Sequence, residues 1–109
     1  NNRLAAAQEF AQKKQVWLVL KGANTIVAAP DGRLYMNVID SPALAVAGSG
    51  DVLAGIIGAF LAQGMQPEDA CCAAVYVHGL AGKHVAETIG EVSSKASDII
   101  SSIPTILMG

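Results

Sequence analysis

The sequence predicts an α/β fold in which a mostly parallel sheet is extended by an antiparallel hairpin. Three observations indicate this class: a helical pattern that leads directly into a short buried strand, two strands around a proline-glycine turn, and a glycine-rich turn that leads into an apolar helix. Sheets of the parallel type are covered on both faces, and the elements in these 109 residues do not supply both layers. We therefore expect the C-terminal part of a larger α/β domain, with the N-terminal half of that domain absent.

An amphipathic helix is expected over residues 1–14. Leu4, Ala7, Phe10 and Ala11 recur at helical spacing, and polar side chains occupy the other face. Residues 16–20 follow as an apolar run rich in β-formers. Because this run does not alternate with polar residues, it favours a strand that is covered on both faces.

A β-hairpin is expected next. Two apolar runs, residues 26–29 and 34–38, flank the sequence Pro-Asp-Gly-Arg at 30–33. Proline is favoured at the second position of a turn and glycine near its end. The hairpin therefore extends one side of the sheet with two antiparallel strands.

Three helices are expected in the remainder of the chain. The first is apolar on nearly all sides, so we expect it to be buried, and it ends at Gly64, a residue type suited to the position after a helix C-terminus. The second opens at Pro67, with acidic residues at the positive end of the helix dipole, and continues toward Ala86. The last covers residues 94–103 and is expected to end before Pro104, because proline disfavours helical conformation in the residue before it.

Composition excludes several classes of function. The chain is 52% hydrophobic with a formal net charge of −2, so it lacks the basic surplus of proteins that bind nucleic acids or anionic membranes. Its longest strongly apolar run, residues 52–62, is too short to span a bilayer. Cys71 and Cys72 are neighbours, which disfavours a disulfide between them and provides no metal-ligand spacing. We expect a reduced, cytoplasmic protein.

The candidate site is the run Ala-Gly-Ser-Gly-Asp-Val-Leu-Ala-Gly at residues 47–55. Gly48 and Gly50 can adopt positive φ and let a ligand approach the backbone, and the helix that follows presents unpaired N–H groups at its positive end. Such a turn binds an anion, and phosphate is the anion we expect. Asp51 has two interpretations: it caps the helix, for which aspartate is preferred, or its carboxylate takes part in chemistry.

Three other polar residues also have two interpretations each. Lys21 follows a strand at the end where α/β sheets bind ligands, and it either faces phosphate or only helps to fix its loop. His78 lies on an apolar helix face, where a satisfied core histidine is more common than a catalytic one. Ser49 is better explained as a small turn residue than as a nucleophile, since the sequence shows no base beside it.

The order of several motifs resembles the C-terminal half of the ADP/ATP-dependent NAD(P)H-hydrate dehydratases, which belong to the ribokinase-like superfamily with its three-layer fold. The resemblance extends over almost the whole chain from about Val16. Its motifs are Lys-Gly-Ala-Asn-Thr at 21–25, Pro-Ala-Leu-Ala at 42–45, Ala-Gly-Ser-Gly-Asp-Val-Leu-Ala-Gly-Ile-Ile at 47–57, Ala-Gln-Gly at 62–64 and Val-Tyr-Val-His-Gly-Leu-Ala-Gly at 75–82. A Gly-x-Gly-Asp motif alone would indicate only the superfamily.

This resemblance implies a metabolite-repair enzyme that removes water from hydrated NADH or NADPH and consumes ADP or ATP. In the family the substrate hydroxyl is phosphorylated and phosphate is then eliminated, and Mg²⁺ is held through the nucleotide phosphates, without protein ligands. By the same resemblance Asp51 contacts the substrate and is the catalytic base. The implied nucleotide-binding residues are Lys21, Gly22, Ala23, Asn24, Thr25, Ser41, Pro42, Ala43, Leu44, Ala45, Val46, Ala47, Gly48, Ser49 and Gly50.

Two other functions stay open at this point. A ribokinase-like small-molecule kinase would share the glycine-rich turn and the base, and a non-catalytic subunit would bind nucleotide without turnover. The extended match over residues 42–57 favours the dehydratase over the kinase, and Asp51 disfavours the degenerate subunit. We expect NAD(P)H hydrate as substrate, a homo-oligomer, and neither nucleic acid nor membrane as partner. Residues 1–109 alone are expected to be inactive and to associate through their apolar helix.

Overall fold

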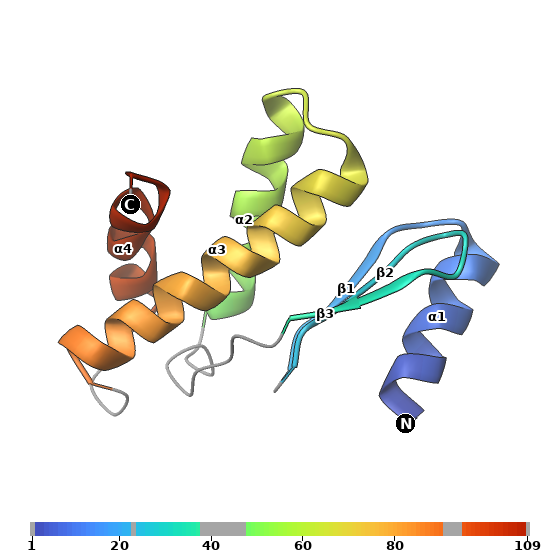
Figure 1. Cartoon of the computed structure of the whole chain (residues 1–109), viewed down its shortest axis with the longest axis horizontal. Coiled ribbons are helices and arrows are strands. Elements are labelled where there is room, and N and C mark those ends of the chain that lie inside the picture. The colour runs from blue at the N-terminus through green and yellow to red at the C-terminus, as the bar shows by residue number, and fades with distance from the viewer. Residues whose placement is uncertain (1, 23, 38–47, 91–94, 109) are drawn as a thin grey trace.

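The computed structural model describes residues 2–22, 24–37, 48–90 and 95–108, which form three layers. A small sheet lies between α1 on one face and the pair α2 and α3 on the other, with α4 beyond α3 (Figure 1). In chain order the elements are α1 (Asn2–Lys14), β1 (Leu18–Leu20), β2 (Ile26–Ala28), β3 (Leu34–Met36), α2 (Ser49–Ala62), α3 (Pro67–Thr88) and α4 (Ala96–Met108). This arrangement confirms the predicted three-layer α/β class.

The strands form one sheet in the order β1-β2-β3, with both pairs antiparallel. The predicted hairpin is thereby confirmed, and no parallel pair occurs among the described strands. Side chains of β2 alternate between the two layers, because successive residues of a strand point to opposite faces. Ile26 and Ala28 pack with Ala7 and Ala11 of α1, whereas Val27 joins the core of α2 and α3.

The strand predicted over residues 16–20 is shorter than expected and only half-buried. Gln15 has a left-handed φ of 55°, and the amide of Val16 donates to the carbonyl of Ala11, so the chain is still leaving α1 at these residues. Val16 is 39% exposed and the strand begins at Leu18. Both faces of β1 are covered, since Leu18 and Leu20 pack on the cluster of α1 and Val19 packs on that of α2 and α3. The strand is only half-buried, and it lies at the edge of the described sheet.

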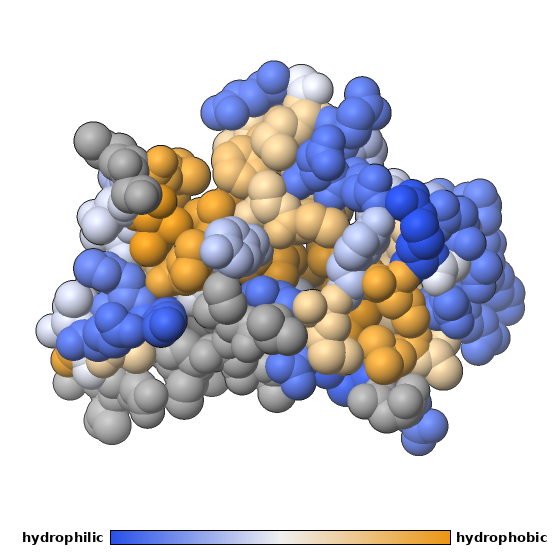
Figure 2. All heavy atoms as spheres, viewed as in Figure 1, coloured by the Kyte–Doolittle hydropathy of each residue, from blue (hydrophilic) through white to orange (hydrophobic). Residues whose placement is uncertain are grey.

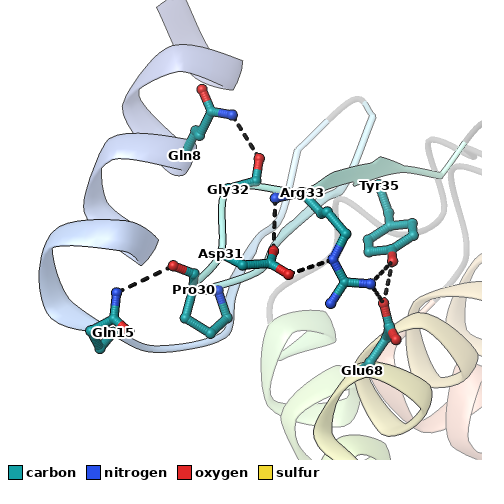
Figure 3. Close-up of polar contacts among 8 residues, drawn as sticks. All are labelled: Gln8, Gln15, Pro30, Asp31, Gly32, Arg33, Tyr35 and Glu68. Atoms are coloured by element: carbon teal, nitrogen blue, oxygen red, sulfur yellow. Dashed lines mark hydrogen bonds and ion pairs between the residues drawn. The ribbon is translucent and has the colours of Figure 1, made fainter.

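The turn between β2 and β3 depends on Gly32, whose φ of 98° lies in the left-handed region. Its amide donates to the carbonyl of Ala29, and the amide of Ala29 donates to the carbonyl of Arg33, which closes the turn. Side chains of α1 hold the turn from outside: Gln8 donates to the carbonyl of Gly32 at 2.6 Å, and Gln15 to that of Pro30 at 3.2 Å (Figure 3).

Arg33 connects this hairpin to α3. Its guanidinium bonds Asp31 at 2.7 Å and Glu68 at 2.6 Å, and the hydroxyl of Tyr35 also donates to Glu68 (Figure 3). The Arg33 guanidinium carbon also lies 5.9 Å from the centre of the Trp17 ring. The network fixes the relative orientation of the hairpin and α3, although ion pairs as exposed as these contribute little to stability.

The helices of the second half begin largely where the sequence predicts. Proline opens α3 at Pro67, and Gly64, with a φ of 92°, follows the C-cap of α2. The expectation that α2 is buried on nearly all sides was wrong within this chain: only Ser49, Leu53 and Ile56 of that helix are buried. Its remaining surface is exposed or half-buried because the described layers cover one side of it.

The prediction that the last helix ends before Pro104 was wrong, because α4 continues through Pro104 to Met108. Ile99 is fully buried against Ala81 and Val85 of α3, and Ile103 and Ile106 pack on the same cluster. These positions lie on one face of a continuous helix. The apolar contacts therefore outweigh the hydrogen bond that proline cannot donate. None of the described helices is long and apolar enough to span a membrane.

Candidate functional site

The first turn of α2 provides the candidate anion site. Gly48 is the N-cap, with a φ of 87°, and its carbonyl accepts the first bond of the helix from the amide of Val52 at 3.1 Å. The N–H groups of Ser49, Gly50 and Asp51 therefore have no partner within the helix. Ser49 is fully buried, whereas Gly50 and Asp51 are exposed. The amides of these two residues, together with the positive end of the dipole, favour an anion such as phosphate.

The two glycines of this turn differ in conformation. Gly48 needs the left-handed region, and a Cβ there would also lie 3.3 Å from the Cβ of Ala96. Gly50 is the second residue of α2 and does not have a positive φ, so of the two glycines that can adopt this conformation only Gly48 does so. Its value to the site is the absence of a side chain at the helix start.

Asp51 is not the N-cap of α2, because Gly48 occupies that position. The carboxylate belongs to the third helical residue and is exposed. In the part of the chain that the structure describes, it has no hydrogen-bond or ion-pair partner. This geometry removes the capping interpretation and leaves the carboxylate available to a ligand.

Asp51 stands at the edge of an apolar groove of about 570 Å³ between α2 and α4. Figure 2 shows apolar side chains gathered between these helices on the face that it displays. The residues that line the groove are Gly48, Asp51, Val52, Gly55, Ile56, Ala59, Phe60, Gln63, Ala96, Ile100, Ile103 and Leu107. Asp51 is their one ionisable member, so the groove combines apolar walls with one carboxylate.

A smaller cavity of about 260 Å³ lies on the other side of the same helix start, between β1 and α2. Lys21 and Gly50 both line it, and a Cβ at Gly50 would lie 3.9 Å from the Cδ of Lys21. The structure thus brings Lys21 to the first turn of α2, as the phosphate-facing interpretation requires. A cation beside free amides strengthens an anion site.

Arg3 is a further residue of this region, and it lies near the start of α1. Its guanidinium donates to the carbonyl of Asn24 at 3.3 Å and to those of Leu20 and Lys21 at 3.5 Å. A Cβ at Gly22 would overlap this guanidinium, so a larger residue there would require the Arg3 side chain to shift. Arg3 therefore holds the loop that carries Lys21, a long-range contact that no sequence pattern reveals.

Ser49 and His78 meet inside the protein. Ser49 is fully buried and His78 is 3% exposed. Nε2 of His78 lies 3.0 Å from the Oγ of Ser49 and 3.1 Å from its carbonyl oxygen. The prediction that His78 is a satisfied core histidine is confirmed. The sequence analysis missed its partner: 29 positions separate the two residues in the chain, and the fold brings them together.

Burial makes His78 sensitive to acid. Desolvation lowers the pKa of its imidazole, and nearby Lys21 lowers it further, although the bond to the Ser49 backbone opposes both effects. Since the folded-state pKa lies below the unfolded value of about 6.5, the unfolded chain binds more protons as the pH falls. The stabilising contribution of neutral His78 is thus complete above that value and is lost as the pH falls through the folded-state pKa.

We therefore expect His78→Gln to reduce the pH dependence of stability. The melting temperature of the wild-type protein should fall more between pH 7.5 and pH 5 than that of the variant, because only the wild type has this imidazole to protonate. Thermal melts at several pH values measure the difference. Parallel curves for the two proteins would contradict the assignment of a depressed pKa to His78.

Several predicted site residues cannot be compared with the structure. Ala23 and the segment Ser41, Pro42, Ala43, Leu44, Ala45, Val46 and Ala47 lie outside the described residues. Two other predicted site residues lie in the described part of the chain. The carbonyl of Asn24 accepts a hydrogen bond from Arg3, which helps to hold the loop. The carbonyl of Thr25 accepts one from the amide of Asn37, which belongs to the hairpin. Among the described residues, no three His, Cys, Asp or Glu side chains are grouped to hold a metal ion.

Comparison with known proteins assigns the chain to a family. Residues 1–105 match the family described as NAD(P)H-hydrate dehydratase. The chain belongs to this family. It is 42% identical over 106 residues to the bifunctional NAD(P)H-hydrate repair enzyme of Moorella thermoacetica, covering 97% of this chain and 20% of that protein. It is also 42% identical over 101 residues to the ADP-dependent (S)-NAD(P)H-hydrate dehydratase of Xanthomonas campestris, covering 93% of this chain and 35% of the relative.

Solved structures agree with this assignment. The ADP/ATP-dependent NAD(P)H-hydrate dehydratase of Bacillus subtilis, co-crystallised with ATP/Mg²⁺, superimposes with a TM-score of 0.92 at 32% identity. The match covers 97% of this chain and 38% of that structure. A ribokinase-like protein of Enterococcus faecalis matches with a TM-score of 0.83 at 34% identity, over 96% of this chain and 36% of the other. The expected ribokinase-like fold is confirmed, and the chain spans between a fifth and two fifths of these relatives.

Proposed function

We propose that the protein containing this chain dehydrates NAD(P)H hydrate at the expense of ADP or ATP, which regenerates NADH or NADPH. The observation that carries the proposal is the position of Asp51, which lies at the start of α2 beside the exposed residue Gly50 and lines an apolar groove. A phosphate at the amides and an uncharged ring in the groove would both be adjacent to its carboxylate. Membership of the NAD(P)H-hydrate dehydratase family supports the same reaction.

In this proposal Asp51 is the catalytic base. Its carboxylate accepts the proton of the substrate hydroxyl while that oxygen bonds to the terminal phosphorus of the nucleotide, whose bridging P–O bond breaks. The C–O bond of the phosphorylated substrate then breaks and inorganic phosphate leaves with the bonding electron pair. Loss of a proton from the neighbouring ring carbon to solvent forms the C=C bond of the dihydronicotinamide. The amides of Gly50 and Asp51 stabilise the negative charge on the transferring group, which is the main contribution that phosphoryl transfer requires of a protein.

The nucleotide is proposed to bind along the predicted residues 21–25 and 41–50. The residues at the start of α2 fit phosphate, because Gly48 and Gly50 carry no Cβ and the side chain of Lys21 lies beside Gly50. Relatives described as ADP-dependent, and one crystallised with ATP/Mg²⁺, support a nucleoside di- or triphosphate. Mg²⁺ bound to the nucleotide phosphates would add positive charge there without protein ligands.

We further propose a cytoplasmic location, a homo-oligomeric state, and residues 1–109 as the C-terminal portion of one nucleotide-binding domain. Both Cys71 and Cys72 are free thiols, as suits a reducing compartment. Burial raises the pKa of both thiols, which keeps them protonated and unreactive.

The fate of phosphate tests the reaction. When the intact protein is incubated with hydrated NADH, Mg²⁺ and ADP or ATP, dihydronicotinamide absorbance should return and free phosphate should appear in equal amount. The ribokinase-like kinase that the sequence leaves open would consume nucleotide and leave phosphate on its product. A non-catalytic subunit would bind nucleotide and give neither signal. A stable phosphorylated product, or no response to the hydrate with either nucleotide, would contradict the proposal.

A further inference from the structure

His78 contacts the functional helix at its first residue. It projects from the middle of α3, and its Nε2 reaches both the side chain and the backbone of Ser49, the residue that opens α2. Gly50 and Asp51 follow immediately. The position of the free amides and of the Asp51 carboxylate therefore depends on the residue that His78 holds.

The carbonyl contact determines which nitrogen carries the proton. A carbonyl oxygen only accepts hydrogen bonds, so Nε2, at 3.1 Å from it, must carry the hydrogen. The same N–H is shared with the Ser49 Oγ at 3.0 Å. The imidazole is neutral at neutral pH, because burial and Lys21 lower its pKa. His78 thus acts as a fixed donor.

We propose that His78 is a positioning residue for the reaction: through Ser49 it holds the first turn of α2 so that its amides and Asp51 keep their reacting geometry. This inference rests on the proposed function of Asp51 and extends it to a residue outside the nucleotide-binding segments. The contact with His78 restrains the N-terminal end of α2, where such a restraint is needed. The turn begins at Gly48, whose conformational freedom would otherwise let the helix start move.

A purely structural role of His78 predicts equal turnover in the two amide variants compared below. His78 also lies among buried residues of α3, so any replacement changes packing there. Two amide variants separate the roles. The side-chain nitrogen of glutamine is as many bonds from Cα as Nε2 of histidine, so His78→Gln can still donate to the Ser49 carbonyl. The nitrogen of asparagine is one bond short, so His78→Asn loses the donor while it buries the same polar group.

The test compares both variants with the wild type in the intact protein. His78→Asn should lower kcat about 10- to 100-fold with little change in the KM for the hydrate, since a displacement of about 1 Å in a catalytic group can cost about 100-fold. His78→Gln should stay within about threefold of the wild type. Hydrogen exchange should accelerate at the amides of residues 52–54 only in His78→Asn, with residues 70–73 of α3 as the internal control.

Each result decides the matter. Equal turnover in the two variants, or unchanged exchange at residues 52–54 in His78→Asn, would refute the positioning role. If the wild-type protein does not repair the hydrate, the proposed function fails. The exchange comparison then still supports or refutes the anchoring of α2 by His78, because that measurement does not require activity.

Discussion

Asp51→Asn is expected to lower the turnover of hydrate repair by about two to four powers of ten, the usual contribution of a positioned general base. Asparagine keeps the size and polarity of the side chain but cannot accept the proton of the substrate hydroxyl. Nucleotide affinity should stay unchanged or improve slightly, because the substitution removes a negative charge beside the phosphate site. Steady-state kinetics and nucleotide titrations on the intact protein measure both quantities.

The chain offers a matched control for this substitution. Asp69 is also an exposed aspartate at the third residue of a helix, in the first turn of α3, which begins at Pro67. Asp69→Asn makes the same chemical change at the same helical position and should leave turnover unaltered. Similar turnover in the Asp51 and Asp69 variants would return Asp51 to a purely structural role.

Ile99→Ala is expected to lower the free energy of unfolding by about 2–5 kcal/mol, the range for truncating a buried isoleucine. Ile99 is 0% exposed and packs on Ala81 and Val85 of α3, so its loss leaves a cavity between α3 and α4. The small side chains of α3 at this contact cannot expand to fill that space. Urea or thermal unfolding of the intact protein measures the loss.

Ile89→Ala is the comparison for this prediction, because Ile89 is the same residue type and is 47% exposed after the end of α3. A substitution at such a position should change the free energy of unfolding by less than about 0.5 kcal/mol. If both variants lost the same stability, the packing of α4 on α3 through Ile99 would not be the source of the effect.

Local residue chemistry was sufficient to predict most elements of this fold. The spacing of Leu4, Ala7 and Ala11, the Pro-Asp-Gly-Arg turn and the opening of α3 at Pro67 each act over a few residues, and each prediction is confirmed. The prediction that the last helix ends before Pro104 was wrong because long-range contacts, rather than local residue chemistry, determine where α4 ends. The local preference against helix was correct in sign, but contacts with α3 decided the outcome.

By itself, the sequence determined the α/β class, the glycine-rich turn at the start of an apolar helix, and the family resemblance, because these depend on residue types at short spacing. Only the tertiary structure decided which distant residues meet. It placed Lys21 beside Gly50, Arg3 on the loop that carries Lys21, and His78 on Ser49. It also showed that the N-cap of α2 is Gly48 and not Asp51. Contacts between residues far apart in the chain depend on how the layers pack, and no local pattern encodes that packing.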